Sequence, residues 1–374
     1  MEYRMIDNEK CSILGFGCMR FPLNEDGSIN EVEATRMLDV ARESGVNYFD
    51  TAYPYHNKES EPFVGRYLSK LPRDSYYLAT KLPCWEINSQ EDAKRIFQLQ
   101  LERLQTEYID FYLLHALNKD QWERMESYGI YDFCASLKEQ GKIKHLGFSF
   151  HDEYDVFETI ITSKKWDFCQ IQYNYMDTEE QAGDKGYELA EKLGVPLVIM
   201  EPIKGSTLAL LPDEIKEHFT SVDKNKSMAS WALRWVASHS HVKVVLSGMS
   251  TYEQVLDNIN TFDKFEPLSD KEQATILEVK NHLQRRIKNG CTSCRYCMPC
   301  PAGVDIPRNF QIWNTYGKYE NSGTSIWEWN NTIKDEEKAK NCISCGKCET
   351  ACPQKLTIRE HLKMLQTELD ALQS

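Results

Sequence analysis

Residues 109–115 read Ile109-Asp110-Phe111-Tyr112-Leu113-Leu114-His115, a short stretch that is apolar almost throughout. Seven more stretches of this kind occur in the first 265 residues, at 12–17, 46–50, 77–82, 143–150, 168–174, 196–202 and 242–248. Apolar runs of this length without strict alternation are typical of strands buried on both faces, as in parallel sheets covered by helices. The sequence therefore predicts eight buried strands.

Amphipathic stretches with helical spacing separate these runs, and residues 30–44, 91–104 and 184–193 are examples. Eight strand–helix units within about 250 residues predict a (β/α)₈ TIM barrel, a fold of the α/β class. A doubly wound sheet is the alternative, but the sequence contains no dinucleotide-binding G-x-G-x-x-G. Residues 3–11 predict a small hairpin that closes the bottom of the barrel.

The overall composition is that of a soluble globular protein. The 374 residues include 44 basic and 57 acidic side chains, which gives a formal net charge of −13. An acidic surface repels phosphate backbones, so we expect no nucleic-acid partner. No apolar run approaches the ~20 residues of a membrane span, and residues 1–4 show no signal-peptide core. These features predict a cytoplasmic protein with no membrane association.

Cysteine is concentrated near the C-terminal end, where eight of the thirteen cysteines fall within residues 291–352. The first motif is Cys291-x2-Cys294-x2-Cys297-x2-Cys300-Pro301, and the second is Cys342-x2-Cys345-x2-Cys348-x3-Cys352-Pro353. Tetrahedral zinc on C-x2-C pairs is one interpretation. Zinc binding does not explain why both motifs contain a third evenly spaced cysteine followed by Cys-Pro. This pattern favours iron–sulfur clusters.

The two motifs resemble the bacterial 2×[4Fe–4S] ferredoxin module, in which the fourth cysteine of each motif ligates the other cluster. The resemblance assigns one cluster to Cys291, Cys294, Cys297 and Cys352, and the other to Cys342, Cys345, Cys348 and Cys300. The x2 spacing before Cys300 departs from the usual x3.

The composition changes abruptly after residue 288, which predicts two domains. Residues 1–288 form the barrel in this interpretation. Residues 289–374 form a small α-rich, ferredoxin-like iron–sulfur domain with a helical insert and a terminal helix.

Four polar residues lie at or just past the ends of the first predicted strands: Asp50, Tyr55, Lys81 and His115. In a (β/α)₈ barrel these ends carry the chemistry. Their order and spacing resemble the Asp/Tyr/Lys/His tetrad of the aldo-keto reductases, and Ser60-Glu61-x3-Gly65 extends the match. The resemblance covers about residues 10–285. It implies an NAD(P)(H)-dependent oxidoreductase of the EC 1.1.1.- type, acting on a small carbonyl or alcohol substrate.

The resemblance also implies a role for each member of the tetrad. A phenol with an ordinary pKa of ~10 is a poor acid at neutral pH, and a nearby cation lowers that pKa. Lys81 supplies the cation, Asp50 orients it, and His115 hydrogen-bonds the carbonyl oxygen. Tyr55 is then the general acid, or the base in the oxidative direction. Tyr53 is a competing phenol, and Tyr55 is preferred because the family's Tyr follows its Asp by five residues.

The cofactor contacts follow from the same resemblance. Ser149 and Gln170 match the residues that hydrogen-bond the nicotinamide carboxamide, although the usual Asn beside the Ser is Phe150 here. The resemblance assigns further contacts to Gly17, Cys18, Met19, Asp50 and Met200, and places Gly248, Gln254 and Asn258 near the adenosine 2′-phosphate. The basic residues of strongly NADP-selective members are absent there, and Lys204 or another loop cation is expected to compensate. The family resemblance favours NADP(H) over NAD(H).

Two functions remain open from the sequence. The first is an enzyme whose clusters serve an external redox partner, a flavoprotein or a ferredoxin, or have a structural role. The second is an electron-transfer or docking module whose barrel is a non-catalytic scaffold. A hydride carries two electrons and a [4Fe–4S] cluster accepts one, and no flavin motif is visible. Trp85 is expected either in the substrate-pocket wall or in the core.

Overall fold

The computed structural model describes residues 1–373, in which eight parallel strands close into a barrel. Their order around the barrel is β10-β3-β4-β5-β6-β7-β8-β9. The strands are β3 (Leu14–Gly17), β4 (Tyr48–Asp50), β5 (Tyr77–Leu82), β6 (Ile109–Leu117), β7 (Ile143–Phe150), β8 (Phe168–Gln172), β9 (Leu197–Met200) and β10 (Val242–Gly248). The predicted barrel is confirmed, and β5, β7 and β10 have the predicted bounds.

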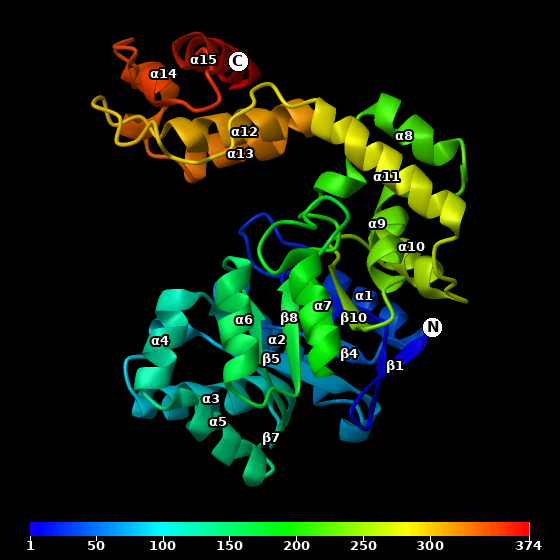
Figure 1. Ribbon diagram of the computed structural model, residues 1–374. Helices are drawn as coiled ribbons and strands as arrows, with labels where there is room; N and C mark the ends of the chain where they lie inside the picture. Colours follow the sequence, from blue (N-terminus) through cyan, green and yellow to red (C-terminus); the bar gives the residue numbers. More distant parts are fainter. Residues whose placement is uncertain (374) are drawn as a thin grey trace. The chain divides into compact units, whose positions relative to one another are not determined.

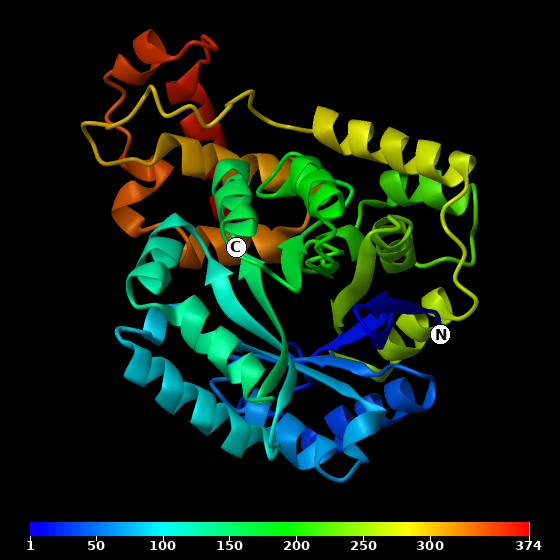
Figure 2. The ribbon, with the colours of Figure 1, turned by 60° about the horizontal axis from the view of Figure 1, so that its bottom comes forward.

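Helices surround the strands of the barrel (Figures 1 and 2). They are α1 (Glu31–Glu43), α2 (Ser60–Leu68), α3 (Gln90–Leu104), α4 (Lys119–Ser127), α5 (Ile130–Glu139), α6 (Tyr154–Ser163), α7 (Gly183–Leu193), α9 (Met228–Ala237) and α10 (Tyr252–Phe262). Helix α3 illustrates how an amphipathic sequence forms a helix here. Ser89 caps its first turn, and its buried face includes Ile96 and Phe97.

A two-stranded hairpin, β1 (Tyr3–Ile6) and β2 (Glu9–Ser12), precedes the barrel. Ile6 and Cys11 are buried in one cluster with Tyr48, Phe111 and other barrel-lining side chains. The hairpin therefore closes one end of the barrel, as the sequence predicted, and leaves the C-terminal ends of the strands for the site.

Helix α2 follows the loop that carries Tyr55 after strand β4. The Ser60-Glu61-x3-Gly65 pattern holds this helix against its neighbours. The buried Glu61 carboxylate accepts hydrogen bonds from Thr80 and Gln100 at 2.7 Å each. A Cβ atom at Gly65 would lie 2.1 Å from a backbone oxygen of α3, so only glycine permits this close approach of the two helices.

The chain divides into two compact units, residues 1–205 with 229–269, and residues 206–228 with 270–374. The second contains α8 (Asp213–Thr220), α11 (Asp270–Arg285), α12 (Ile306–Tyr319), α13 (Ser322–Asn331), α14 (Lys347–Ala351) and α15 (Ile358–Gln373). The sequence placed the division after residue 288. In the structure α11 packs against α8 and belongs to the second unit.

The second unit has a small hydrophobic core of its own, in which α12, α13 and α15 bury Phe310, Trp313, Trp329, Leu362 and Leu365. Its predicted terminal helix is α15, and the predicted helical insert contains α12 and α13. Of the helices within residues 1–373, none is long and apolar enough to cross a membrane.

Candidate active site and metal centre

The register of the barrel brings distant residues together at the C-terminal ends of its strands. Gly17 on β3 lies beside Asp50 on β4 and beside Gly248 on β10. Ser149 on β7 lies beside Gln170 on β8. These five residues are spread over more than 200 positions of the sequence, and the closed sheet places them around one opening.

A pocket lies at this end of the barrel. Its walls are formed by Gly17, Met19, Arg20, Asp50, Tyr55, His115, Ser149, His151, Gln170, Met200, Glu201, Leu246 and Gly248. Most of the residues that the sequence indicated are therefore brought together here. Four are not among the lining residues. Lys81 is buried and paired with Asp50, the Cys18 side chain is fully buried, Asn258 hydrogen-bonds Ser247, and Gln254 accepts from the Ser250 amide.

Lys81 and Asp50 form a buried ion pair next to the pocket. The Lys81 Nζ atom donates to Asp50 Oδ1 at 2.5 Å and to the Thr51 carbonyl oxygen at 2.8 Å. Burial favours the neutral forms, and it raises the pKa of Asp50. Burial alone would lower the pKa of Lys81, but Asp50 and Tyr55 outweigh it and raise that pKa. Lys81 is therefore held as a cation.

Tyr55 lies beside this cation and beside His115. The Lys81 Nζ atom is 5.2 Å from the centroid of the Tyr55 ring, and the Tyr55 and His115 rings meet edge to face at 6.2 Å. Burial raises the pKa of Tyr55, while Lys81 acts in the opposite direction. The sequence predicted a lowered pKa. The structure corrects this, because the cost of burying a phenolate exceeds the stabilisation that Lys81 provides.

His115 is neutral at physiological pH. Burial, the Lys81 cation and His151 together hold the pKa of His115 well below its usual value. Its Nδ1 atom is buried and has no hydrogen-bond partner within the part of the chain that the structure describes. Trp85 lies next to it, with ring centroids 5.0 Å apart, and 40% of Trp85 is exposed. Trp85 is thus not in the core; it lies beside His115 but is absent from the pocket lining.

The competing phenol, Tyr53, faces a different environment. It is buried between two cations: Lys58 donates to its hydroxyl at 3.5 Å, and the Arg103 guanidinium lies 4.8 Å from its ring centroid. Tyr53 is absent from the pocket lining, whereas Tyr55 is part of it.

Ser149 and Gln170 offer one donor and one acceptor to the pocket. The Ser149 hydroxyl oxygen accepts a hydrogen bond from the Ala116 amide at 2.7 Å, which leaves its own proton to donate. The Gln170 Oε1 atom is buried and has no partner among residues 1–373. A primary carboxamide needs one donor and one acceptor, so this pair fits it. Phe150 packs outward against Phe157 and takes no part.

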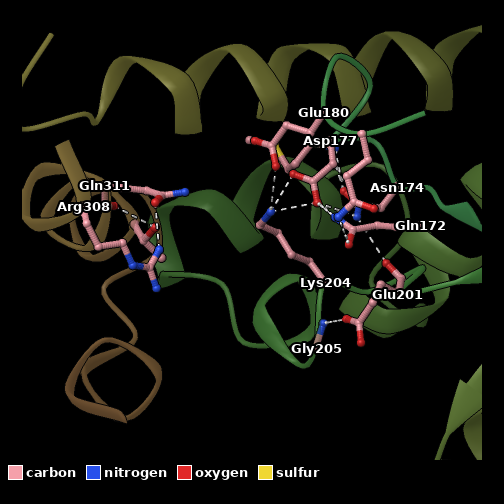
Figure 3. A network of polar contacts seen from close by, with 12 residues as sticks. Gln172, Asn174, Asp177, Glu180, Glu201, Lys204, Gly205, Arg308 and Gln311 are labelled. Atoms are coloured by element: carbon pink, nitrogen blue, oxygen red, sulfur yellow. Dashed lines mark hydrogen bonds and ion pairs between the residues drawn. The ribbon is translucent and has the colours of Figure 1, made fainter. Parts of the chain in front are cut away.

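Lys204 does not supply a free cation to the pocket. Figure 3 shows its ammonium group on Asp177, at 2.6 and 2.7 Å from the two carboxylate oxygens. Gln172 and Asn174 also donate to Asp177, at 2.9 Å each. This network joins the loop after β8 to the loop after β9. The expectation that Lys204 compensates for missing basic residues is therefore not supported by its position.

Four residues that the sequence did not single out also line the pocket: Arg20, His151, Glu201 and Leu246. Arg20 follows the predicted contact Met19, and His151 follows Phe150, so both continue a strand end already identified. Glu201 accepts a hydrogen bond from the Gly205 amide and has a positive φ of 53°. Glu201 and Leu246 fall inside the predicted runs 196–202 and 242–248, and His151 and Arg20 lie just past the ends of the runs 143–150 and 12–17, so the strand ends carried a signal for all four.

The second unit contains two cavities lined by the cysteines. One is lined by Cys291, Cys294, Cys297 and Cys352, together with apolar residues such as Phe310 and Leu356. The other is lined by Cys300, Cys342, Cys345 and Cys348, together with Cys297, Lys347 and Arg359. Each cavity thus contains the four cysteines that the ferredoxin resemblance assigned to one cluster.

The grouping of four cysteines around each cavity suits a [4Fe–4S] cluster. Each of the four thiolates of a [4Fe–4S] cluster bonds a separate iron atom, so they stand around a larger volume. The four-cysteine lining of each cavity fits that requirement.

The fold and the pocket define a (β/α)₈-barrel protein whose site lies at the C-terminal ends of the strands. The sequence model of the aldo/keto reductase family matches residues 13–281, and the chain belongs to this family. The sequence model of the 4Fe-4S dicluster domain matches residues 290–357. The predicted fusion of an aldo-keto reductase barrel to a two-cluster domain is confirmed.

Relatives with assigned names are oxidoreductases. The chain is 26% identical to an L-galactose dehydrogenase of Arabidopsis thaliana over 311 residues, covering 76% of this chain and 95% of the relative. It is 26% identical to a glyoxal reductase of Bacillus subtilis, covering 63% of this chain and 79% of the relative.

Solved structures share the barrel. The holo form of the aldo-keto reductase AKR11C1 from Bacillus halodurans is 27% identical and has a TM-score of 0.63, covering 75% of this chain and 96% of that one. An aldo-keto reductase from Klebsiella pneumoniae in complex with NADPH is 21% identical, with a TM-score of 0.57 and coverage of 72% and 92%. The latter likeness concerns the fold alone.

Proposed function

We propose that the barrel catalyses the NADP(H)-dependent reduction of a small aldehyde or ketone to an alcohol, or the reverse reaction. The observation that carries this proposal is the convergence of Asp50, Tyr55 and His115 at one pocket, with Lys81 paired to Asp50 beside it and with a donor and an acceptor that suit a carboxamide. Membership of the aldo/keto reductase family supports the choice of a nicotinamide cofactor.

Tyr55, Lys81 and Asp50 each have a separate role in the transfer of a proton to the substrate. The bound nicotinamide, when reduced, supplies a hydride to the carbonyl carbon. Tyr55 donates its phenolic proton to the carbonyl oxygen, where negative charge develops. Its raised pKa keeps that proton in place at neutral pH. The Lys81 cation, held by Asp50, then stabilises the phenolate that the transfer leaves behind.

His115 and the two amide-binding residues position the reactants. The neutral imidazole of His115 donates a hydrogen bond to the carbonyl oxygen and fixes its distance from Tyr55. Ser149 and Gln170 hold the carboxamide and thereby orient the ring face toward the substrate. Met200 lines the same pocket and supplies an apolar, polarisable surface for the ring.

For the second unit, we propose two [4Fe–4S] clusters that pass single electrons to or from an external redox partner, a flavoprotein or a ferredoxin. Cys294 and Cys345, one in each cavity, are exposed, which suits electron exchange at a surface. The reduction of a carbonyl by a hydride needs no iron, so a purely structural role for the clusters is the competing interpretation.

The test uses protein purified under anaerobic conditions. Iron and sulfide assays should find about eight of each per chain, as two cubanes require. Tyr55→Phe should lower kcat for NADPH-dependent reduction of an aldehyde panel by roughly 10²-fold or more, because general acid catalysis contributes ~10²–10⁴. The matched control, Tyr53→Phe, should retain turnover. Unchanged turnover in Tyr55→Phe would overturn the assignment, and zinc without iron would overturn the clusters.

The role of the clusters is tested separately. Cys342→Ser with Cys345→Ser should abolish carbonyl reduction driven by an artificial one-electron donor, while carbonyl reduction by NADPH survives. If the wild-type protein has no one-electron route, with or without added flavin, the clusters are structural.

A further inference from the structure

Helices α8 and α11 pack against each other within the second unit (Figure 1), and each carries one histidine to their contact. The His218 Nε2 atom lies 3.3 Å from the His282 Nδ1 atom. The two rings meet edge to face, with their planes 88° apart and their centroids at 5.3 Å. Both residues are half-buried, and neither lines the barrel pocket or the cysteine cavities. This histidine pair therefore lies outside both sites described above.

A carboxylate lies on the opposite side of the His218 ring. Glu278 precedes His282 by four residues, so both side chains share one face of α11. The Glu278 Oε1 atom is 3.5 Å from the His218 Nδ1 atom. A carboxylate at this position favours a proton on Nδ1 and leaves the lone pair of Nε2 free on the side of His282. Histidines that bind metal ions are commonly oriented by a carboxylate in this way.

The separation of the two nitrogen atoms fits two ligands of one metal ion. Zinc–nitrogen bonds of about 2.0–2.1 Å at a tetrahedral angle place the nitrogen atoms about 3.3–3.4 Å apart. The observed 3.3 Å lies in this range. It is longer than the roughly 2.7–3.2 Å of an ordinary hydrogen bond from an N–H group. A direct hydrogen bond between the rings is therefore the weaker explanation of the pair.

Solvent can reach the pair and supply further ligands. Of the His218 side chain, 27% is exposed. A surface groove along α11 is lined by Glu278, Asn281, His282 and Arg285, among others. Imidazole ligands suit Zn²⁺, whereas Ca²⁺ and Mg²⁺ prefer oxygen ligands. Two histidines with water in the other positions therefore point to a transition-metal ion.

We propose that His218 and His282 bind one Zn²⁺ ion, with Glu278 orienting His218 and water completing the coordination. In the sequence, residues 206–228 lie between two segments of the first unit, yet they belong to the second. The ion joins α8, which lies in this segment, to α11. Zinc binding thereby stabilises the contact between the two helices. The inference does not depend on the function proposed for the barrel or for the clusters.

Zinc binding is measured by isothermal titration calorimetry on the untagged protein, with its clusters loaded and under anaerobic conditions. The wild type should bind one Zn²⁺ ion per chain at this site. His218→Gln and His282→Gln should each weaken this binding at least about tenfold, because each removes one of the two protein ligands. Glu278→Gln should weaken it by roughly 10-fold or more, the loss typical of a residue that orients a metal-bound histidine.

The matched control is Glu214→Gln. It removes the ion pair between Glu214 on α8 and Arg286, next to the end of α11, and leaves both histidines in place. This variant should bind zinc as the wild type does. Iron analysis before and after each titration shows whether zinc has displaced iron from the cysteines.

Hydrogen exchange of residues 213–220 gives a second measurement. Because binding stabilises the state that binds, zinc should slow the exchange of α8 in the wild type and in Glu214→Gln. It should have no such effect in His282→Gln.

Equal zinc affinity in the wild type and in both histidine variants would overturn the proposal, because it would place the bound ion elsewhere, for example on the cysteines. Absence of zinc binding by the loaded wild-type protein would also overturn it and would leave a direct hydrogen bond between the two rings. Wild-type affinity in Glu278→Gln, with binding lost in the histidine variants, would contradict the orienting role of Glu278.

Discussion

The barrel pocket draws its residues from strands that are far apart in the sequence, whereas each cysteine cavity draws its thiolates from two short loops. In the barrel, Asp50 and Lys81 are buried and joined by an ion pair, and the closed sheet fixes their backbones. In the second unit, none of the eight cysteines is buried, and the loops that carry them have little regular structure.

The difference indicates what holds each site in place. The pocket of the barrel is preorganised by the protein, because every strand end is fixed by hydrogen bonds to two neighbouring strands. The cysteine loops lack such bonds, and their geometry depends on the clusters they bind. Metal binding to sites of this kind is coupled to local folding.

The largest expected effect is therefore the loss of the clusters. Chelation of iron after oxidation should expose residues 291–301 and 342–353, so that their backbone amides exchange hydrogen as fast as in an unfolded chain. Residues 109–117, in strand β6, should keep their protection. Hydrogen exchange followed by mass spectrometry measures both regions in one sample.

An equal loss of protection in β6 would contradict this expectation, because it would mean that the clusters also stabilise the barrel. Cys134→Ala, at a buried cysteine of the barrel, is the control and should leave the iron content unchanged.

The second prediction concerns the pH dependence of carbonyl reduction. Reduction needs a protonated Tyr55, which is present below its pKa and lost as the pH rises through it. Because burial raises the pKa of Tyr55 and lowers that of His115, kcat should be flat from pH 6 to 9. It should then fall about tenfold per unit only at pH values above the ordinary phenol pKa of ~10, because the pKa of Tyr55 is raised. A break near pH 6.5, or a falling limb centred near pH 8, would contradict these assignments.

The smallest expected effect concerns the electrostatics of the second cavity. The Arg359 guanidinium lies 3.6 to 3.8 Å from the Cβ position of Gly346, between Cys345 and Cys348, and pairs with Glu349 at 2.7 Å. Arg359→Gln should leave the Glu349 charge uncompensated and so lower the reduction potential of this cluster. The shift is small because both side chains are solvent-accessible.

A redox titration followed by electron paramagnetic resonance measures this potential. The other cluster should be unaffected, and the exposed Lys363→Gln serves as the control. A potential that rises, or one that moves equally in both clusters, would contradict the local origin of the effect.

Much of the fold and of the site could be predicted because the relevant signals are local in sequence. The apolar runs marked the strands, and the residues that end them, such as Asp50 and His115, were placed at the pocket. What could not be predicted depends on packing between distant segments. The position of Arg20 over Gly248 follows from the pairing of β3 with β10, and the engagement of Lys204 follows from an acid on another loop.

The direction of the Tyr55 pKa shift was wrong for a similar reason. The presence of Lys81 was visible in the sequence, but the depth at which Tyr55 is buried was not, and burial has the larger effect. Likewise, Cys18 follows Gly17 in the sequence, yet its side chain points into the core and only its neighbours reach the pocket.

The central claim, that the barrel transfers a hydride to a carbonyl, is tested most directly by isotope transfer. NADPH carrying two deuterium atoms at C4 of the nicotinamide is incubated with the anaerobically purified protein and an aldehyde in ordinary water. The product is examined by mass spectrometry and nuclear magnetic resonance. Hydride transfer should place one deuterium on the carbinol carbon of the alcohol, and Tyr55→Phe should form this product at least ~10²-fold more slowly. Alcohol without deuterium, or deuterium released only to water, would contradict it.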